Sequence, residues 1–266
     1  MMPEPLSELQ RVALILEYDG RDLCGWQRQN NGPSVQQHLE EALQCIDGSP
    51  VACVASGRTD AGVHAEAMAA HADVQRSRFR RSPMAYVHGV NQHLPEGIRV
   101  SAVRPVRPDF HARFDCRERA YRYQIWNRGT APAIERWRHW WMPRPLDIPA
   151  MQQAASHLIG RHDFSCFRAS GCQAASPERE VRMLGITQHG WCVSIDVSAD
   201  AFLYHMVRNI VGSLVRVGLG KWQADYMVEL IGHRNRLLAG ETAPAHGLYF
   251  TNAVYDDFSS RSPEAL

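Results

Sequence analysis

The stretch Gly-Arg-Thr-Asp-Ala-Gly-Val-His-Ala at residues 57–65 is the most informative part of this 266-residue chain. It follows a short apolar segment, residues 51–55, and precedes a second one, residues 67–74. Short apolar runs of this length predict buried strands. The stretch therefore predicts a tight loop that presents the carboxylate of Asp60 between two strands.

Three residues around the aspartate indicate what this loop does. Gly57 and Gly62 are expected to let the backbone take conformations that a side chain forbids, and to let a ligand approach closely. Arg58 offers a planar cation that suits a phosphate group. A carboxylate held beside such a cation indicates chemistry on a nucleotide. On spacing alone the pattern is more often that of a plain turn, because Asp and Gly are turn residues for local backbone reasons.

Composition narrows the class of protein. A chain of 266 residues forms one large domain or two of ordinary size. It has no run of 18 apolar residues, so no membrane helix is expected. The seven cysteines are scattered without a Cys-x-x-Cys motif, which predicts neither a disulfide framework nor a zinc site. With no basic, apolar leader at residues 1–10, the sequence predicts a cytoplasmic protein.

The net charge of +1 conceals a strongly basic middle region. Residues 76–144 contain 15 basic and 5 acidic side chains, the charge pattern of a protein with a polyanionic partner. All but one of the 29 basic residues are arginine, which suits phosphate contacts and base stacking, although genome composition gives the same bias. The candidate RNA contacts are Arg76, Arg78, Arg80 and Arg81, followed by Arg128, Arg136 and Arg138 with Trp137. Each of them is also compatible with an ordinary solvated surface.

Hydrophobic periodicity predicts the order strand, helix, strand, strand, helix, strand in the first half. These elements are expected at residues 12–18, 34–46, 51–55, 67–74, 84–94 and 98–103. Ser34 and Gln37 form a capping box at the start of the first helix. The two prolines of residues 104–108 predict a domain boundary, which gives domains at 1–107 and 108–266.

The second half again mixes strands and helices. They are expected at residues 119–125, 148–159, 181–188, 191–197, 205–217, 224–231 and 247–255. The predicted fold class is therefore α+β, with two similar split βαβ, ferredoxin-like domains. Their antiparallel sheets are expected to meet at a central basic cleft with Asp60 at its floor.

Several strings, taken together, resemble the tRNA pseudouridine synthase A family. The nine residues 57–65 resemble the active-site motif of that family, and the resemblance extends from about residue 12 to residue 256. The other matching strings lie at residues 18–20, 25–29, 34–36, 110–114, 121–123, 160–164, 202–209 and 243–249. One departure is Leu23, where family members more often carry an aromatic residue.

The resemblance implies an isomerase that converts uridine to pseudouridine at positions 38–40, in the anticodon stem and loop of tRNA. It also implies a homodimer across which one tRNA binds. The reaction breaks the N1–C1′ bond and joins C5 to C1′ without oxidation or addition, so no cofactor and no metal are expected. An ionised carboxylate is required, and Asp60 fits that role. Attack at C1′, attack at C6 and loss of the base to a glycal all remain open.

Three further residues are candidates in this site. Arg208 begins an otherwise apolar helix, where a charge needs a partner, so it is the predicted partner of Asp60; the alternative is a solvent-facing arginine. Tyr121 is expected to stack on the flipped base, and Leu248 to form an apolar wall beside it. Tyr123 points to the same face of the strand as Tyr121, so spacing alone does not choose between them.

Three other functions compete with this one. A phosphatase using Asp19 needs a magnesium ion held by several carboxylates, which Asp19 and Asp22 alone do not supply. A nucleoside hydrolase also uses carboxylates but releases free base. A plain RNA-binding module fits the basic residues and leaves the stretch at residues 57–65 unexplained. An assay of uridine isomerisation in tRNA distinguishes all of them.

Overall fold

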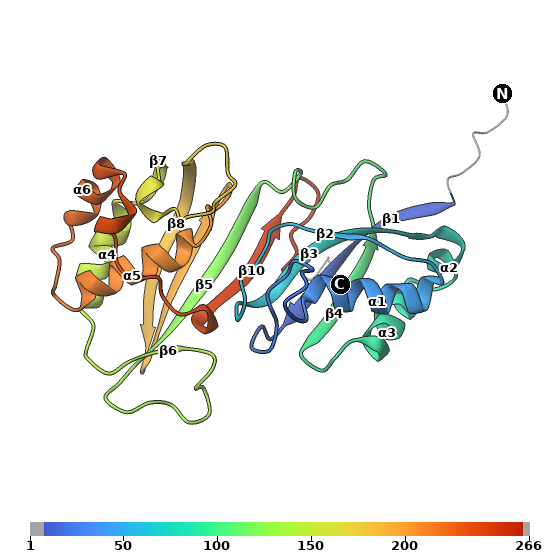
Figure 1. The fold of residues 1–266 in the computed structure, drawn as a ribbon, viewed down its shortest axis with the longest axis horizontal. Helices are drawn as coiled ribbons and strands as arrows, with labels where there is room; N and C mark the ends of the chain where they lie inside the picture. Colours follow the sequence, from blue (N-terminus) through green and yellow to red (C-terminus); the bar gives the residue numbers. More distant parts are fainter. Residues whose placement is uncertain (1–7, 263–266) are drawn as a thin grey trace. The chain divides into compact units, whose positions relative to one another are not determined.

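The computed structural model describes residues 8–262 as two compact units. Unit 1 contains the described residues up to Arg117 together with those from Phe250 onward, and unit 2 runs from Glu118 to Tyr249. Both mix helices with a mostly antiparallel sheet, as the sequence predicts (Figure 1). The more detailed prediction, two similar split βαβ domains meeting at a basic cleft, stays a prediction.

The division between the units lies ten residues after the predicted one. Arg104 and Pro105 do not form a linker but complete strand β4 (Ile98–Pro105), where they pair with Ala13 and Val12. A proline is tolerated at this end position of an edge strand. The loop that follows is hydrogen-bonded within unit 1, so the chain leaves this unit only after Arg117.

Unit 1 is a sheet with two helices packed together on one face (Figure 1). Strand β1 (Leu9–Tyr18) lies between β4 and β3 (His64–Gln75) and is antiparallel to both. Strand β2 (Cys53–Ala55) and strand β10 (Leu248–Val254) are further neighbours of β3. The helices are α1 (Val35–Asp47) and α3 (Pro83–His93), and the short α2 (Arg76–Arg81) follows β3 directly.

Helix α1 begins and ends where its sequence dictates. Ser34 is the N-cap, and its hydroxyl accepts the N–H of Gln37 at 3.3 Å. Gly48 ends the helix with a φ of 78°, a left-handed conformation that glycine adopts without strain. Buried Asp47 then joins the elements around it: it accepts the Tyr86 hydroxyl of α3 at 2.7 Å and the N–H of Gln75 at 2.8 Å. The predicted first helix is confirmed.

Unit 2 is an antiparallel sheet packed with a buried helix. Its strands follow the order β5 (Glu118–Asn127), β9 (Cys192–Ala199), β8 (Glu178–His189), β7 (Gly160–Asp163), and β6 (Trp140–Met142) runs parallel to β5. The helices are α4 (Ile148–Ser156), α5 (Met206–Gly218) and α6 (Tyr226–His233). Short 3₁₀ turns lie at Ser165–Phe167, Arg236–Leu238 and Ala245–Gly247.

Helix α5 is the core of unit 2, because eleven of its thirteen residues are buried. A Cβ atom on Gly212 would lie 1.7 Å from the carbonyl oxygen of Glu241, so the segment before β10 approaches the helix backbone directly. Asn209, fully buried on this helix, donates to the carbonyl of Phe167 and accepts from Arg236 and Thr242. These contacts fix the helix start that carries Arg208. Between residues 8 and 262 no helix is both long and apolar enough to cross a membrane.

Candidate active site

The loop between β2 and β3 holds Asp60 in a tight turn. The N–H of Val63 donates to the carbonyl of Asp60 at 3.2 Å, which closes a four-residue turn. Gly62 occupies its third position with a φ of 79°, as a type II turn requires. The side chain of Asp60 is half-buried and that of Arg58 is exposed.

Only one of the two glycines that flank the aspartate has the predicted conformational role. Gly57 does not have a positive φ, so the expectation for this residue was wrong. The reason is that Ser56 still donates its N–H to Ala69 at 2.8 Å, which continues the β2–β3 pairing up to Gly57. The turn needs a left-handed residue only at Gly62.

A second segment, residues 18–26, braces the Asp60 loop from outside. The Tyr18 hydroxyl and the Thr59 hydroxyl are hydrogen-bonded at 2.9 Å. The N–H of Trp26 donates to the carbonyl of Thr59 at 3.1 Å, and the N–H of Gly62 donates to that of Leu23 at 3.3 Å. Leu23 thus contributes to the site through its backbone carbonyl, so its departure from the family pattern leaves this contact intact.

Two glycines of the bracing segment allow it to come this close. A Cβ atom on Gly20 would lie 2.1 Å from the carbonyl oxygen of Val63. A Cβ atom on Gly25 would lie 2.3 Å from the carbonyl oxygen of Thr59 and 2.8 Å from the carbonyl carbon of Asp60. Gly25 also has a φ of 87°. At both points the atoms that a Cβ would overlap belong to the backbone. A side-chain rotation therefore cannot relieve the clash.

We expect Gly25→Ala to displace the Asp60 loop. The new methyl group overlaps the backbone of Thr59 and must also tolerate a left-handed φ, so the folded state should lose about 2–4 kcal/mol. Turnover should fall more than tRNA affinity does, because the clash is at the loop itself. The matched control is Gly129→Ala, where a Cβ atom meets nothing within 4 Å. Wild-type turnover by Gly25→Ala in single-turnover assays would show that the loop is not held by this contact.

His64 ties the end of the motif back to the bracing segment. Its side chain is 2% exposed, its Nδ1 accepts the N–H of Gly20 at 3.1 Å, and the carboxylate of Asp19 lies 3.2 Å from the same nitrogen. Burial raises the pKa of Asp19, but hydrogen bonds from the side chain and the backbone N–H of Arg21 outweigh it and leave the pKa below its usual value. Asp19 is therefore an ionised structural group of this turn.

Unit 2 contains the other two predicted catalytic residues. Arg208 lies in the first turn of α5, half-buried, and its Nε donates to the carbonyl of Ala243 at 2.7 Å. The N–H of Ala243 donates in return to the carbonyl of Arg208 at 3.1 Å. His205, the residue before this helix, has a φ of 59°, an uncommon conformation for a residue that is not glycine. The pairing of Arg208 with Asp60 stays a prediction.

The two tyrosines of β5 differ in what they contact. Tyr123 is fully buried; its hydroxyl donates to the carbonyl of Pro244 at 2.7 Å, and a Cβ atom on Gly247 would lie 2.7 Å from its ring. Burial raises the pKa of Tyr123 well above its ordinary value. Tyr121 is 8% exposed and packs edge-on against Phe202 at 5.1 Å. Tyr123 is therefore a structural residue of the core. The alternation of side chains along the strand did not predict this difference between the two tyrosines.

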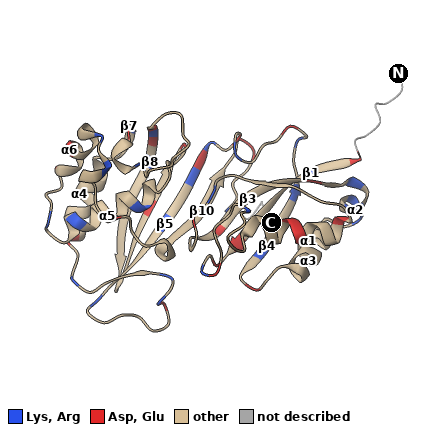
Figure 2. Ribbon diagram, in the orientation of Figure 1, with Lys and Arg blue, Asp and Glu red and all other residues tan. Residues whose placement is uncertain are grey.

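The remaining candidates are distributed over both units. Leu248, at the start of β10, is buried. In unit 1 the four clustered arginines form α2, a helix that the sequence did not predict (Figure 2). Arg80 and Arg81 are exposed, whereas Arg76 donates to the carbonyl of Leu9 at 3.1 Å and Arg78 to that of Ile46 at 2.7 Å.

The second group of basic residues in the predicted RNA surface belongs to unit 2. The guanidinium of Arg128 lies 4.7 Å from the ring centre of Trp191 and 5.4 Å from that of Trp126. Arg136 lies 4.8 Å from the ring of Trp137, which is 46% exposed. The carbonyl of Arg138 accepts the Tyr249 hydroxyl at 2.9 Å. Cation–π pairs of this kind present both a charge and an aromatic surface to solvent.

Sequence reasoning missed the residues that support the site. Gly20, Gly25 and Tyr18 hold the Asp60 loop from a segment about 40 residues earlier, and only the family resemblance in that segment pointed to them. No group of three or more His, Cys, Asp or Glu side chains in residues 8–262 is arranged to hold a metal ion.

Known proteins similar to this chain come from one family model and from several curated relatives. Residues 14–115 and 154–256 match a family model described as tRNA pseudouridine synthase. A tRNA pseudouridine synthase A of Rhodospirillum centenum is 50% identical over 248 residues, which cover 93% of this chain and 100% of that protein. The corresponding protein of Hydrogenovibrio crunogenus is 47% identical over 246 residues, covering 92% and 93%. A solved Cbf5-Nop10-Gar1 complex matches with a TM-score of only 0.38 and 11% identity, covering 90% of this chain and 48% of that one.

Proposed function

This chain belongs to the tRNA pseudouridine synthase family, and from that premise we propose that Asp60 is the nucleophile with which it isomerises uridine at positions 38–40 of the anticodon stem and loop. The chain is thus an isomerase that acts on uridine in tRNA. The observation that carries the role of Asp60 is the braced turn that presents its carboxylate, inside the matched region 14–115. Tritium release from tRNA labelled at C5 of uridine tests the proposal.

The geometry of the loop suits nucleophilic catalysis. A carboxylate that attacks a sugar or base carbon must be held in one position, and the turn at Gly62 and the contacts from residues 18–26 hold this backbone on two sides. The target uridine lies in a stacked stem or loop and must be flipped out to reach the carboxylate. Attack at C1′, attack at C6 and loss of the base to a glycal all use the same group.

The residues of unit 2 receive complementary roles. Arg208 supplies the cation that keeps Asp60 ionised when substrate excludes water. Tyr121 stacks on the flipped base and its hydroxyl helps to move the C5 proton, while Leu248 forms the apolar wall. Arg58 binds a phosphate next to the target. The reaction is redox-neutral and needs neither a cofactor nor a metal. We also propose that the protein acts in the cytoplasm, as a homodimer across which one tRNA binds.

The two tyrosines should respond differently to loss of the hydroxyl. Tyr121→Phe keeps the stacking surface, so tRNA affinity should hold while turnover falls by about tenfold or more. Tyr123→Phe leaves the carbonyl of Pro244 without its donor, so stability should fall by about 1–2 kcal/mol with turnover close to wild type. Single-turnover rates and urea unfolding separate the two effects. Reversed behaviour of the two variants would mean that the base contacts Tyr123.

The arginines of α2 provide a test of the RNA surface. We propose that Arg80 and Arg81 contact phosphates, so the double alanine variant should reduce the slope of log affinity against log salt by about 1.5. The control is Arg78→Ala on the same helix, which loses the bond to Ile46 and should cost stability more than salt dependence. Filter binding at several salt concentrations measures the slope. An unchanged slope for the double variant would identify this end of α2 as a solvated face.

A further inference from the structure

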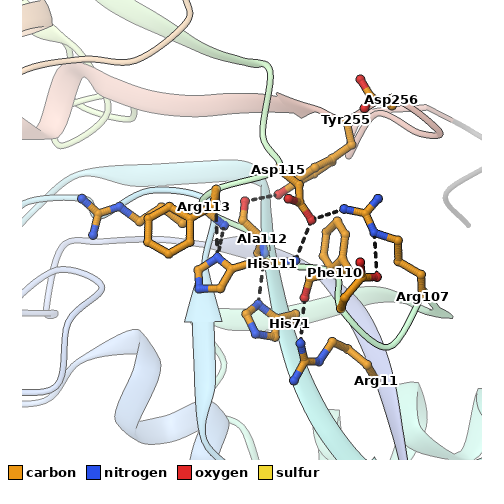
Figure 3. Close-up of polar contacts among 12 residues, drawn as sticks. Arg11, His71, Arg107, Phe110, His111, Ala112, Arg113, Asp115, Tyr255 and Asp256 are labelled. Atoms are coloured by element: carbon orange, nitrogen blue, oxygen red, sulfur yellow. Dashed lines mark hydrogen bonds and ion pairs between the residues drawn. The ribbon is translucent and has the colours of Figure 1, made fainter.

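The loop of residues 107–117, between β4 and β5, is anchored firmly on its inner side. Phe110 and Ala112 are buried there, and Arg11 donates to the carbonyl of Phe110 at 3.1 Å. The N–H of Ala112 donates to Nδ1 of His71 at 3.1 Å, and the hydroxyl of Tyr255 donates to the carbonyl of Ala112 at 2.8 Å (Figure 3). The centre of this loop is therefore fixed from three other parts of unit 1.

His71 is suited to its role as an acceptor. Burial, with the positive charge of Arg11 and the neighbouring His111, lowers the pKa of His71 to about 4. The ring is therefore neutral at physiological pH, and its Nδ1 lone pair is free to receive the N–H of Ala112. The bond from Ala112 to His71 is therefore present at neutral pH.

A second set of bonds fixes the outer half of the 107–117 loop. The N–H of His111 donates to the carboxylate of Asp115 at 2.8 Å, and Arg107 pairs with the same carboxylate. Nδ1 of His111 then accepts the N–H groups of both Arg113 and Phe114 at 3.2 Å (Figure 3). The backbone that carries the next side chains is thereby held in one conformation.

This rigid backbone presents an aromatic ring to solvent. Phe114 is 74% exposed, the largest exposed fraction of any Phe, Trp or Tyr in residues 8–262. One face of its ring stacks on the imidazole of His111, at 4.2 Å between centroids and 29° between planes. The guanidinium of Arg113, also exposed, lies 6.0 Å from the ring centre. A phenylalanine in this position buries little apolar surface within the chain, so its own packing does not account for it.

We propose that Phe114 is a stacking platform for an unpaired nucleobase of the tRNA substrate, with Arg113 contacting an adjacent phosphate. Proteins bind single-stranded nucleic acid by stacking its bases on aromatic rings and by contacting its phosphates with basic side chains. Phe114, supported by the ring of His111, and Arg113 provide both kinds of contact. The ring is fixed in advance, so binding costs little conformational entropy. The proposal rests on tRNA being the substrate and adds a contact outside the Asp60 loop.

The position of the platform makes it a binding element rather than part of the chemistry. It is anchored at His71, seven residues further along β3 than His64, the first residue of this strand and part of the motif at residues 57–65. At a rise of about 3.3 Å per residue, the two ends of this segment are roughly 23 Å apart. Loss of the platform should therefore weaken tRNA binding and leave the rate of the bound complex unchanged.

Phe114→Ala and Phe114→Leu test the stacking contact in the full-length protein. We expect Phe114→Ala to bind unmodified tRNA roughly 10- to 100-fold more weakly, with the single-turnover rate at saturating tRNA close to wild type. Phe114→Leu keeps apolar surface but has no π face, so it should bind as poorly as the alanine variant, whereas Phe114→Trp should bind at least as well as wild type. The matched control is Leu237→Ala, which removes an aliphatic side chain that is 90% exposed and should bind tRNA normally.

The outcomes separate this inference from the proposed function. The wild-type protein is first shown to form pseudouridine. If Phe114→Ala or Phe114→Leu then binds tRNA as tightly as the wild type, the stacking platform is overturned and the enzyme activity stands. Failure of the wild-type protein to form pseudouridine overturns the proposed function instead. Arg113→Gln should lower the salt slope of binding by about 0.7–0.9, and an unchanged slope would contradict the phosphate contact. Thermal unfolding checks that each variant is folded, and the exposure of Phe114 predicts that it is.

Discussion

Asp60→Asn is expected to abolish pseudouridine formation and to leave folding and tRNA affinity close to wild type. The amide has almost the shape of the carboxylate but no nucleophilic charge, so the rate should fall at least about 10³-fold. The bonds that brace the loop come from Thr59, Gly62 and the backbone carbonyl of Asp60, and the substitution removes none of them. Single-turnover tritium release measures the rate, and filter binding measures the affinity.

The neighbouring bracing segment supplies a control for this variant. Asp22 is exposed there, and Asp22→Asn changes the same charge without touching the loop, so its turnover should match wild type. Addition of EDTA should also leave the wild-type rate unchanged, because the chemistry needs no metal. Turnover by Asp60→Asn at the wild-type rate would remove Asp60 from the mechanism.

Arg208→Leu is expected to have the second-largest effect. If Arg208 supplies the cation for Asp60, its loss should slow turnover by about 10²-fold or more. The variant also loses the bond from Nε to Ala243, which should cost about 1–2 kcal/mol of stability. Arg208→Lys restores the charge without the planar fork, so it should recover part of the rate. Single-turnover rates at saturating tRNA, with urea unfolding alongside, separate the two losses.

Arg216, two turns later on the same helix, provides the comparison for this prediction. Its side chain is 33% exposed and pairs with Glu241 at 3.5 Å. Arg216→Leu should therefore change stability slightly and leave turnover near wild type. Equal effects of the two substitutions on turnover would show that Arg208 acts through the packing of α5 and not on the reaction.

Local signals were sufficient for most of the individual elements. The hydroxyl of Ser34 caps α1 as its capping-box position predicts, whereas the side-chain amide of Gln37 donates to Glu41 at 3.0 Å. The apolar helix predicted at residues 205–217 is α5, and the alternating strand at 119–125 is β5. These elements have strong periodicity or a cap, and such signals depend on residues within one or two turns.

Features that depend on distant residues were not accessible to the same reasoning. The turn at Asp60 needs a left-handed residue only at Gly62, because β2–β3 pairing continues through Ser56. The arginines of α2 form a helix because β3 ends at Gln75 and Phe79 is buried. A cluster of charged residues in the sequence predicts neither of these features. Tyr121 and Tyr123 lie on the same face of one strand, so the sequence does not distinguish them. Only the hydrogen bond from Tyr123 to the carbonyl of Pro244 shows that Tyr123 is a structural residue.

The family assignment therefore contributed what periodicity could not. Residues 19–29 carry no periodic hydrophobic pattern, yet a Cβ atom on Gly25 would overlap the backbone of Thr59 and Asp60. A tertiary contact between segments about 35 residues apart produces no hydrophobic periodicity in either segment, so the sequence pattern does not predict it. The nine residues 57–65 were informative because a long, unusual string specifies a complete local structure, in which Asp60, Gly62 and His64 each have a separate partner or conformation.

The most direct test of the central claim is to incubate the purified protein with a tRNA transcript tritiated at C5 of its uridines, and to map the product. We expect tritium release with a matching amount of pseudouridine at positions 38–40. A transcript with cytidine at those three positions should release none. Release of free uracil would identify a hydrolase, and tight binding without tritium release would identify an RNA-binding module. Either result would show that the protein is not a pseudouridine synthase.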